Sequence, residues 1–238
     1  MSRICSAGYT GSWFGVLAMF LATAAQAQEA VVPEKPAALA EAEAPGPSDG
    51  ASGAPPLAAE DAGELHIRLA QDDAASRSTR DQLQRLLETY DVAPWIWTRE
   101  IVIDSGGRVI PHSHPVLTLS TRHLRDDELL LATFVHEQLH WFVDRHDEAL
   151  ALARADLAKL FPEVPVGYPE GARDERSTYV HLVVCYLEYR ALIQLVGGLR
   201  ARWVIEFWSH DHYAWVYRTL LERGRDVGGI VAARGLLP

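Results

Sequence analysis

The sequence predicts an α+β fold, in which a small, mostly antiparallel sheet packs against one central helix and further helices follow. Two observations carry this prediction. Residues 96–120 are rich in β-branched side chains and are interrupted by turn residues, which is typical of short strands. From residue 129 onward, apolar residues recur at helical spacing in several long segments. Strands followed by a run of helices indicate an α+β domain.

The beginning of the chain is expected to lie outside this domain. Residues 13–22 (WFGVLAMFLA) are apolar but too short to span a bilayer, and a small-x-small cleavage site follows at residues 25–27. We therefore predict a signal peptide at residues 1–27 and a secreted or periplasmic protein. Residues 28–64 are rich in Ala, Pro and Glu, which predicts a disordered linker. The folded domain is expected at residues 65–238.

The charge balance argues against a nucleic-acid partner. The chain holds 22 Lys and Arg against 32 Asp and Glu, a net charge of −10. Neither nucleic acid nor an anionic membrane surface is expected to bind such a chain. We also expect no membrane span after the signal peptide, because no later segment reads as long and apolar enough. Without residues 1–27, Cys185 is the only cysteine, so the mature chain has no intramolecular disulfide.

The region before the central helix is expected to begin with an amphipathic helix at residues 75–90. A strand is predicted at residues 96–104, and Ser105-Gly106-Gly107 is a turn signal. A return strand would start at residues 108–110, and after two prolines the strand pattern resumes at residues 116–120. A hairpin here would make the sheet mostly antiparallel.

The region after the central helix is expected to be helical. One helix is predicted at residues 149–160, followed by a Pro- and Gly-containing loop at residues 161–176 of the size that lids or cleft walls have. The next helix would be capped by Ser177 or Thr178, run to residue 196 and stop at a Gly-Gly pair. An aromatic helical region is predicted at residues 203–221.

The central helix carries the pattern His-Glu-x-x-His. Two histidines four residues apart, His136 and His140, project from one face of a helix about one turn apart. Two imidazoles placed in this way can reach one tetrahedral zinc ion, and Glu137 can hold a water molecule beside it. An inert core role is a poor explanation, because two buried histidines and a carboxylate would need partners.

This stretch resembles the zincin metallopeptidases. The resemblance implies that His136 and His140 bind Zn²⁺, that Glu137 is the catalytic general base, and that the last strand before the helix offers its edge to an extended peptide substrate. The metzincin branch requires a Gly and a third His shortly after the second histidine, and residues 141–146 do not supply them. The string at residues 110–142 also resembles uncharacterised bacterial proteins, which implies a shared fold but no substrate.

A third zinc ligand is expected on the helix after the loop. His181, Cys185 and Glu188 lie there at i, i+4 and i+7, on one face. The surroundings of Glu188 resemble the gluzincin branch, in which a Glu on a second helix is followed three residues later by Ala, here Ala191. The Asp that usually follows that Ala is Leu192 in this chain. We prefer Glu188 as the third ligand, with His181 as the alternative or as a donor to the transition-state oxyanion; a Cys185 thiolate is least favoured.

Other polar residues have weaker expectations. The Pro-flanked His112 and His114 are interpreted as a surface turn near the site, where they could contact substrate. A polar patch follows the metal motif, and one of its acids could accept the free N–H of a ligand histidine. This patch comprises Asp144, His146, Asp147 and Glu148. The last aromatic region offers residues that could line a cleft or stabilise an oxyanion: His210, His212, Tyr213 and Tyr217.

Together these features predict a secreted zinc-dependent metallopeptidase acting on a peptide or protein substrate. Two alternatives stay open at this point. The chain could be a non-catalytic zinc-binding module, or a hydrolase of a non-peptide amide such as one in cell-wall material. Replacing Glu137 with Gln separates the enzyme hypotheses from the binding module, because only an enzyme would lose turnover while keeping its zinc.

Overall fold

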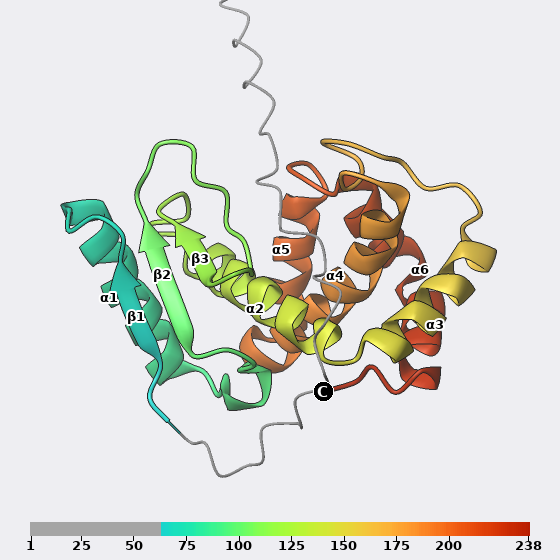
Figure 1. Ribbon diagram of the computed structural model, residues 1–238, viewed down its shortest axis with the longest axis horizontal. Helices are drawn as coiled ribbons and strands as arrows, with labels where there is room; N and C mark the ends of the chain where they lie inside the picture. The colour runs from blue at the N-terminus through green and yellow to red at the C-terminus, as the bar shows by residue number, and fades with distance from the viewer. Residues whose placement is uncertain (1–62) are drawn as a thin grey trace, which may run out of the picture. The chain divides into compact units, whose positions relative to one another are not determined.

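The computed structural model describes residues 63–238, which form a three-stranded sheet followed by a group of helices (Figure 1). The predicted signal peptide and nearly all of the predicted linker lie outside the described residues. The elements occur in the order β1 (His66–Leu69), α1 (Ala74–Thr89), a short 3₁₀ helix (Ala93–Trp95), β2 (Glu100–Asp104), β3 (Leu117–Ser120), α2 (Asp127–Asp144), α3 (Asp147–Leu160), α4 (Glu175–Val196), α5 (Gly198–Trp208) and α6 (Ala214–Ala233).

The sheet is parallel, so the prediction of a mostly antiparallel sheet is wrong. Its strands lie in the order β1–β2–β3, and both neighbouring pairs are parallel. Two features of the sequence account for the difference. Strand β1 was not predicted; it pairs with β2, and α1 lies in the crossover connection that this parallel pairing requires. Residues 108–110 form no strand; the chain instead loops back before β3 begins.

One face of the sheet is buried under helices. Ile101 pairs with Ile67 on one side and Leu117 on the other, and each row of this kind contributes apolar side chains to the core. Helix α1 packs on β1 and β2, α2 packs on β3, and the two helices contact each other. All four residues of β3 are buried, a continuous pattern that is typical of strands in parallel sheets.

Helix α2, the helix that carries the metal motif, lies between the sheet and the remaining helices (Figure 1). Asp127 and Glu128 occupy its first turn, where negative charge suits the helix dipole. Because β3 contacts one side of α2 and α4 contacts another, apolar residues surround most of its circumference. Its position therefore encloses the motif within the domain.

Helix α4 is central to the helical half and packs against α2, α3, α5 and α6. Its N-cap is Asp174, whose carboxylate accepts a hydrogen bond from the Ser177 backbone N–H, so the expected cap at Ser177 or Thr178 is wrong. Gly197, with φ 84°, ends the helix as predicted. By length and composition alone α4 could cross a membrane, which corrects the expectation that no later segment would qualify; half of that window is buried inside the fold.

The predicted aromatic helix at residues 203–221 is two helices, α5 and α6. The break between them contains Tyr213, a non-glycine residue at φ 46° that precedes the first residue of α6. Left-handed backbone at such a residue is unfavourable and tends to occur where surrounding structure imposes it. The break turns the chain so that the N-terminus of α6 lies beside the N-terminal part of α4, where the rings of His181 and Tyr213 are in contact.

Candidate metal centre

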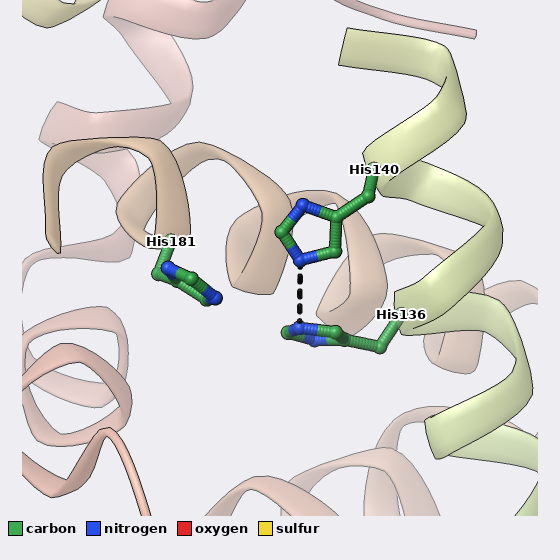
Figure 2. A group of neighbouring side chains, drawn as sticks. All are labelled: His136, His140 and His181. Carbon is green, nitrogen blue, oxygen red and sulfur yellow. Dashed lines mark hydrogen bonds between the residues drawn. The ribbon is translucent and has the colours of Figure 1, made fainter. Parts of the chain in front are cut away.

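Three histidines from two helices converge in the interior of the domain. Figure 2 shows His136 and His140 projecting from α2 toward His181, which projects from α4. The Nε2 atoms of His136 and His140 are 3.2 Å apart. One nitrogen from each of the three rings lies within 4.8 Å of the others. These residues could therefore hold a metal ion.

The spacing of the two α2 imidazoles agrees with shared coordination. Zinc–nitrogen bonds of about 2.0–2.1 Å at a tetrahedral angle separate two ligand nitrogens by roughly 3.3 Å. The 3.2 Å separation of the His136 and His140 nitrogens is close to that value. Two unprotonated nitrogens this near would repel each other, so a proton or a cation must be shared between them. The i, i+4 spacing on one helix produces this geometry without help from other elements.

In His136 and His181, Nδ1 has a hydrogen-bond partner outside the group of three histidines, which leaves Nε2 available to a metal ion. His136 Nδ1 lies 2.9 Å from Glu188 Oε2, and His181 Nδ1 lies 2.8 Å from the Ser177 backbone oxygen. A backbone carbonyl and an ionised carboxylate only accept, so with Glu188 ionised each Nδ1 donates and each Nε2 keeps its lone pair. Ser177 was not predicted as a partner, although it precedes His181 by one helical turn.

The electrostatics of the site favour a bound cation. Burial lowers the pKa of His136 and of His181 to about 3, and it lowers the pKa of His140 well below its usual value, so these imidazoles are neutral, as ligands must be. Burial also raises the pKa of Glu137 and of Glu188 to about 8. No Lys or Arg of the described chain forms an ion pair with either acid. A divalent cation would supply the missing positive charge.

Glu188, the residue preferred as third ligand from the sequence, lies on the other side of His136 from His140. Its carboxylate contacts Nδ1 of His136, whereas His140 faces Nε2 of the same ring. The side chain is 1% exposed, and the Tyr217 hydroxyl donates to its Oε2 at 2.8 Å. With His136 and Cys185, Glu188 forms a second group close enough to hold an ion, but that group does not include His140. The structure thus brings the three histidines together and places Glu188 at Nδ1 of His136, on the side of that ring away from His140.

Glu137 follows His136 on α2 and is 7% exposed. Within residues 63–238 its carboxylate accepts no hydrogen bond, unlike that of Glu188. A nearly buried carboxylate without a protein donor is available to a water molecule or a substrate N–H. Its position next to a ligand histidine is the one expected of a general base.

The tyrosines of the last region have different positions. The Tyr213 ring contacts that of His181, with centroids 4.0 Å apart and planes tilted by 33°, and lies nearly parallel to the ring of His136. It therefore borders the metal centre. Tyr217 is 1% exposed and directs its hydroxyl to Glu188, so it lies behind the site and does not line a cleft. His212 pairs with Asp211, whereas His210 is exposed in the turn after α5 and its Nδ1 donates to the Glu206 carbonyl of that helix.

The segment at residues 110–115 covers the outer edge of β3. Thr118 exchanges both backbone hydrogen bonds with His112 in an antiparallel bridge. The Trp141 indole on α2 donates to the Ser113 carbonyl at 2.8 Å and stacks on His114. The strand edge that the zincin resemblance would offer to a peptide is therefore occupied at Thr118 by the chain itself.

The polar patch after His140 makes contacts away from the three histidines. Of its residues, Asp144 pairs with His114 and His146 bonds to the Phe142 carbonyl, so in the described structure neither is the partner of a histidine of the candidate metal centre.

The loop at residues 161–176 is fixed to α6. The Ala214 N–H donates to the Pro169 carbonyl at 2.8 Å, next to Tyr213, and Arg218 pairs with Glu170. This loop forms a wall beside the aromatic side of the site.

Comparison with known protein families, with curated proteins and with solved structures gives no match to this chain.

Proposed function

We propose that this protein is a zinc-dependent hydrolase that cleaves peptide bonds. The observation that carries the proposal is the convergence of His136, His140 and His181 around one point, with Glu137 adjacent on the same helix. Three imidazoles suit zinc, and three protein ligands with a fourth position left for water or substrate are typical of catalytic rather than structural zinc sites. In this proposal His181, not Glu188, is the third ligand.

His136, His140 and His181 would hold the zinc ion, which would supply Lewis-acid chemistry for the hydrolysis of an amide bond. Glu137 would accept a proton from the attacking water and pass it to the leaving amine. Burial raises the pKa of Glu137 in the metal-free protein, and a cation held by the neighbouring histidines would lower it again, toward the range that suits a general base near neutral pH. Tyr213 packs against the ring of His181 and restricts it, which would help to hold the third ligand in place.

A second substrate class is favoured by one observation. The bridge between His112 and Thr118 occupies the β3 edge that an extended peptide would use for strand addition. A hydrolase of a non-peptide amide, such as one in cell-wall material, does not need that edge. The signal-like residues 1–27 place either substrate outside the cytoplasm in this proposal.

The test is metal content and turnover of the full chain, side by side with Glu137→Gln and His140→Gln. We expect about one zinc per chain in the parent and in Glu137→Gln, and no tightly held zinc in His140→Gln. Turnover is measured on a mixture of internally quenched peptides and on peptidoglycan fragments, and it should fall by roughly 10²-fold or more in Glu137→Gln. Zinc in the parent with no turnover on either substrate would leave a non-catalytic zinc-binding module. A parent without zinc contradicts the proposal.

A further inference from the structure

The side of His136 that faces away from the metal centre contacts a buried carboxylate held by three helices. Glu188 on α4 accepts from His136 Nδ1 on α2 at 2.9 Å and from the Tyr217 hydroxyl on α6 at 2.8 Å, both at Oε2. Glu188 and Tyr217 are each 1% exposed. Water therefore has little access, and these bonds have no easy substitute.

The second carboxylate oxygen indicates that the group is more than a structural hydrogen-bond acceptor. Glu188 Oε1 is buried and accepts no hydrogen bond of normal geometry, although the Trp208 indole, itself without a partner, interacts with this carboxylate. No Lys or Arg of the described chain pairs with the carboxylate. A buried ionised carboxylate is unfavourable unless a positive charge lies nearby. A divalent cation held by the three histidines, on the far side of the His136 ring, would supply such a charge.

The direction of the hydrogen bond has a chemical consequence for the metal ligand. A carboxylate that accepts from Nδ1 holds the imidazole in the tautomer with a free Nε2, fixes the ring orientation and makes Nε2 a stronger donor to a metal. The Tyr217 hydroxyl in turn fixes the carboxylate. Glu188 cannot serve this role and also join His140 around one ion, because the two contact opposite nitrogens of the same ring.

From this arrangement we infer that Glu188 is a positioning residue that acts on the metal through His136, and that Tyr217 holds Glu188 in place. The inference rests on the proposed metal site, but it does not depend on turnover or on the substrate. It also assigns a role to Tyr217, which lies too deep to contact a substrate.

Zinc affinity of the full chain, measured by competition with a chromophoric chelator, tests this inference. Glu188→Gln keeps an acceptor for His136 but loses the charge, and we expect zinc to bind about 10–100-fold more weakly at an unchanged stoichiometry of one. Tyr217→Phe should weaken zinc binding less, in the same direction. The double variant should lose less than the product of the two single losses, because both act through one contact.

Two controls separate positioning from general loss of structure. Tyr186→Phe removes another tyrosine hydroxyl between α4 and α6, close to Gly228, and should leave zinc affinity unchanged. The ¹⁵N and ¹H signals of the His136 side chain, recorded with zinc bound, should show a protonated Nδ1 that shifts in Tyr217→Phe, while the His181 signals stay in place. If Glu188→Gln fails to fold, Tyr217→Phe alone still tests the inference.

Several outcomes would overturn it. Zinc lost in Glu188→Gln but retained in His181→Gln would make Glu188 a ligand. Unchanged zinc affinity in both Glu188→Gln and Tyr217→Phe would show that the contact does not act on the metal. A parent that binds no zinc overturns this inference together with the proposed site. Absence of turnover with the expected affinity pattern counts against the proposed activity alone.

Discussion

At the scale of single residues, one buried glutamine connects the metal helix to the sheet. Gln138 lies inside the His-Glu-x-x-His pattern and is 0% exposed. Its Oε1 accepts from the backbone N–H groups of Trp97 and Thr98, at 2.7 and 2.8 Å, and its Nε2 donates to the Thr98 carbonyl at 2.8 Å. The side chain thus satisfies three backbone groups just before β2, and its two neighbours on α2 are Glu137 and Leu139.

Replacing this side chain should be costly. Gln138→Met keeps the length but leaves those three backbone groups without partners, and we expect the free energy of unfolding to fall by roughly 3 kcal/mol. Gln194→Met, at an exposed position of α4, should change it by no more than about 0.5 kcal/mol. Denaturant unfolding of both variants and the parent measures the difference. Equal effects in the two variants would show that the contacts of Gln138 contribute little.

Acid should destabilise the fold through His123. This side chain is 5% exposed and packs edge-on against Trp208, and burial lowers its pKa to about 4, with a smaller contribution from Arg122. The unfolded chain then binds the proton more readily than the folded one between pH 6.5 and 4, so stability falls as the pH falls through that window. The parent should lose about 2 kcal/mol from this group between pH 7.5 and pH 5.

His123→Asn isolates that contribution. The other buried histidines are present in both proteins, so the difference between the two stability curves reports residue 123 alone. We expect the variant to be less sensitive to acid than the parent over this range, measured by denaturant unfolding at several pH values. Parallel curves would mean that His123 titrates normally in the folded protein.

At the scale of elements, the packing of α6 on α4 depends on a close approach at one glycine. A Cβ added at Gly228 would overlap the phenol ring of Tyr186, with Cε2 of that ring only 2.8 Å away. The neighbouring Gly229 lies in the same helix, and a Cβ there would meet no atom within 4 Å. The two glycines therefore have opposite roles, although they are adjacent in sequence.

Alanine at these two glycines should change the free energy of unfolding in opposite directions. Gly229→Ala should raise the free energy of unfolding by up to about 1 kcal/mol, because alanine favours helix over the unfolded chain. Gly228→Ala should lower it by roughly 1–3 kcal/mol, because Tyr186 must move out of a packed interface. Thermal unfolding of the two variants and the parent measures both changes. A stabilising Gly228→Ala would show that Tyr186 moves aside without cost.

At the scale of the whole molecule, the candidate metal centre joins two parts of the fold. Helix α2 also packs on the sheet, and α4 is the centre of the helical group. An ion bound by His136 and His140 on α2 and by His181 on α4 would connect the two parts directly. Since the site exists only in the folded chain, binding free energy adds to folding free energy.

Zinc should therefore raise the stability of the full chain. Free zinc at 100 times its dissociation constant should add about 2.7 kcal/mol to the free energy of unfolding, and a chelator should remove that gain. The measurement is thermal unfolding with zinc and with chelator. His140→Gln is the control and should show no zinc-dependent shift; a shift of equal size in that variant would place the zinc elsewhere.

Several elements could be predicted because their signals are local. The helix predicted at residues 75–90 is α1, one residue earlier at each end, and the metal-motif helix and the stop at Gly197 are also found. Helical spacing, acidic first turns and glycine at a helix end act over a few residues, so a sequence displays them directly. The pairing of His136 with His140 is equally local, because the helix alone sets their separation.

Strand direction and the third member of the site depended on tertiary structure. Whether β3 runs parallel to β2 depends on how residues 105–116 return across the sheet, and no short pattern records that path. His181 and Glu188 lie on the same face of one helix, and the sequence could not decide which would reach the metal centre. The rotation of α4 against α2 decided it, by bringing His181 beside His140 and Glu188 beside the opposite nitrogen of His136. The sequence by itself determined the chemistry that is available, because side-chain type and helical spacing are local; only packing between helices distant in the chain decided which groups meet.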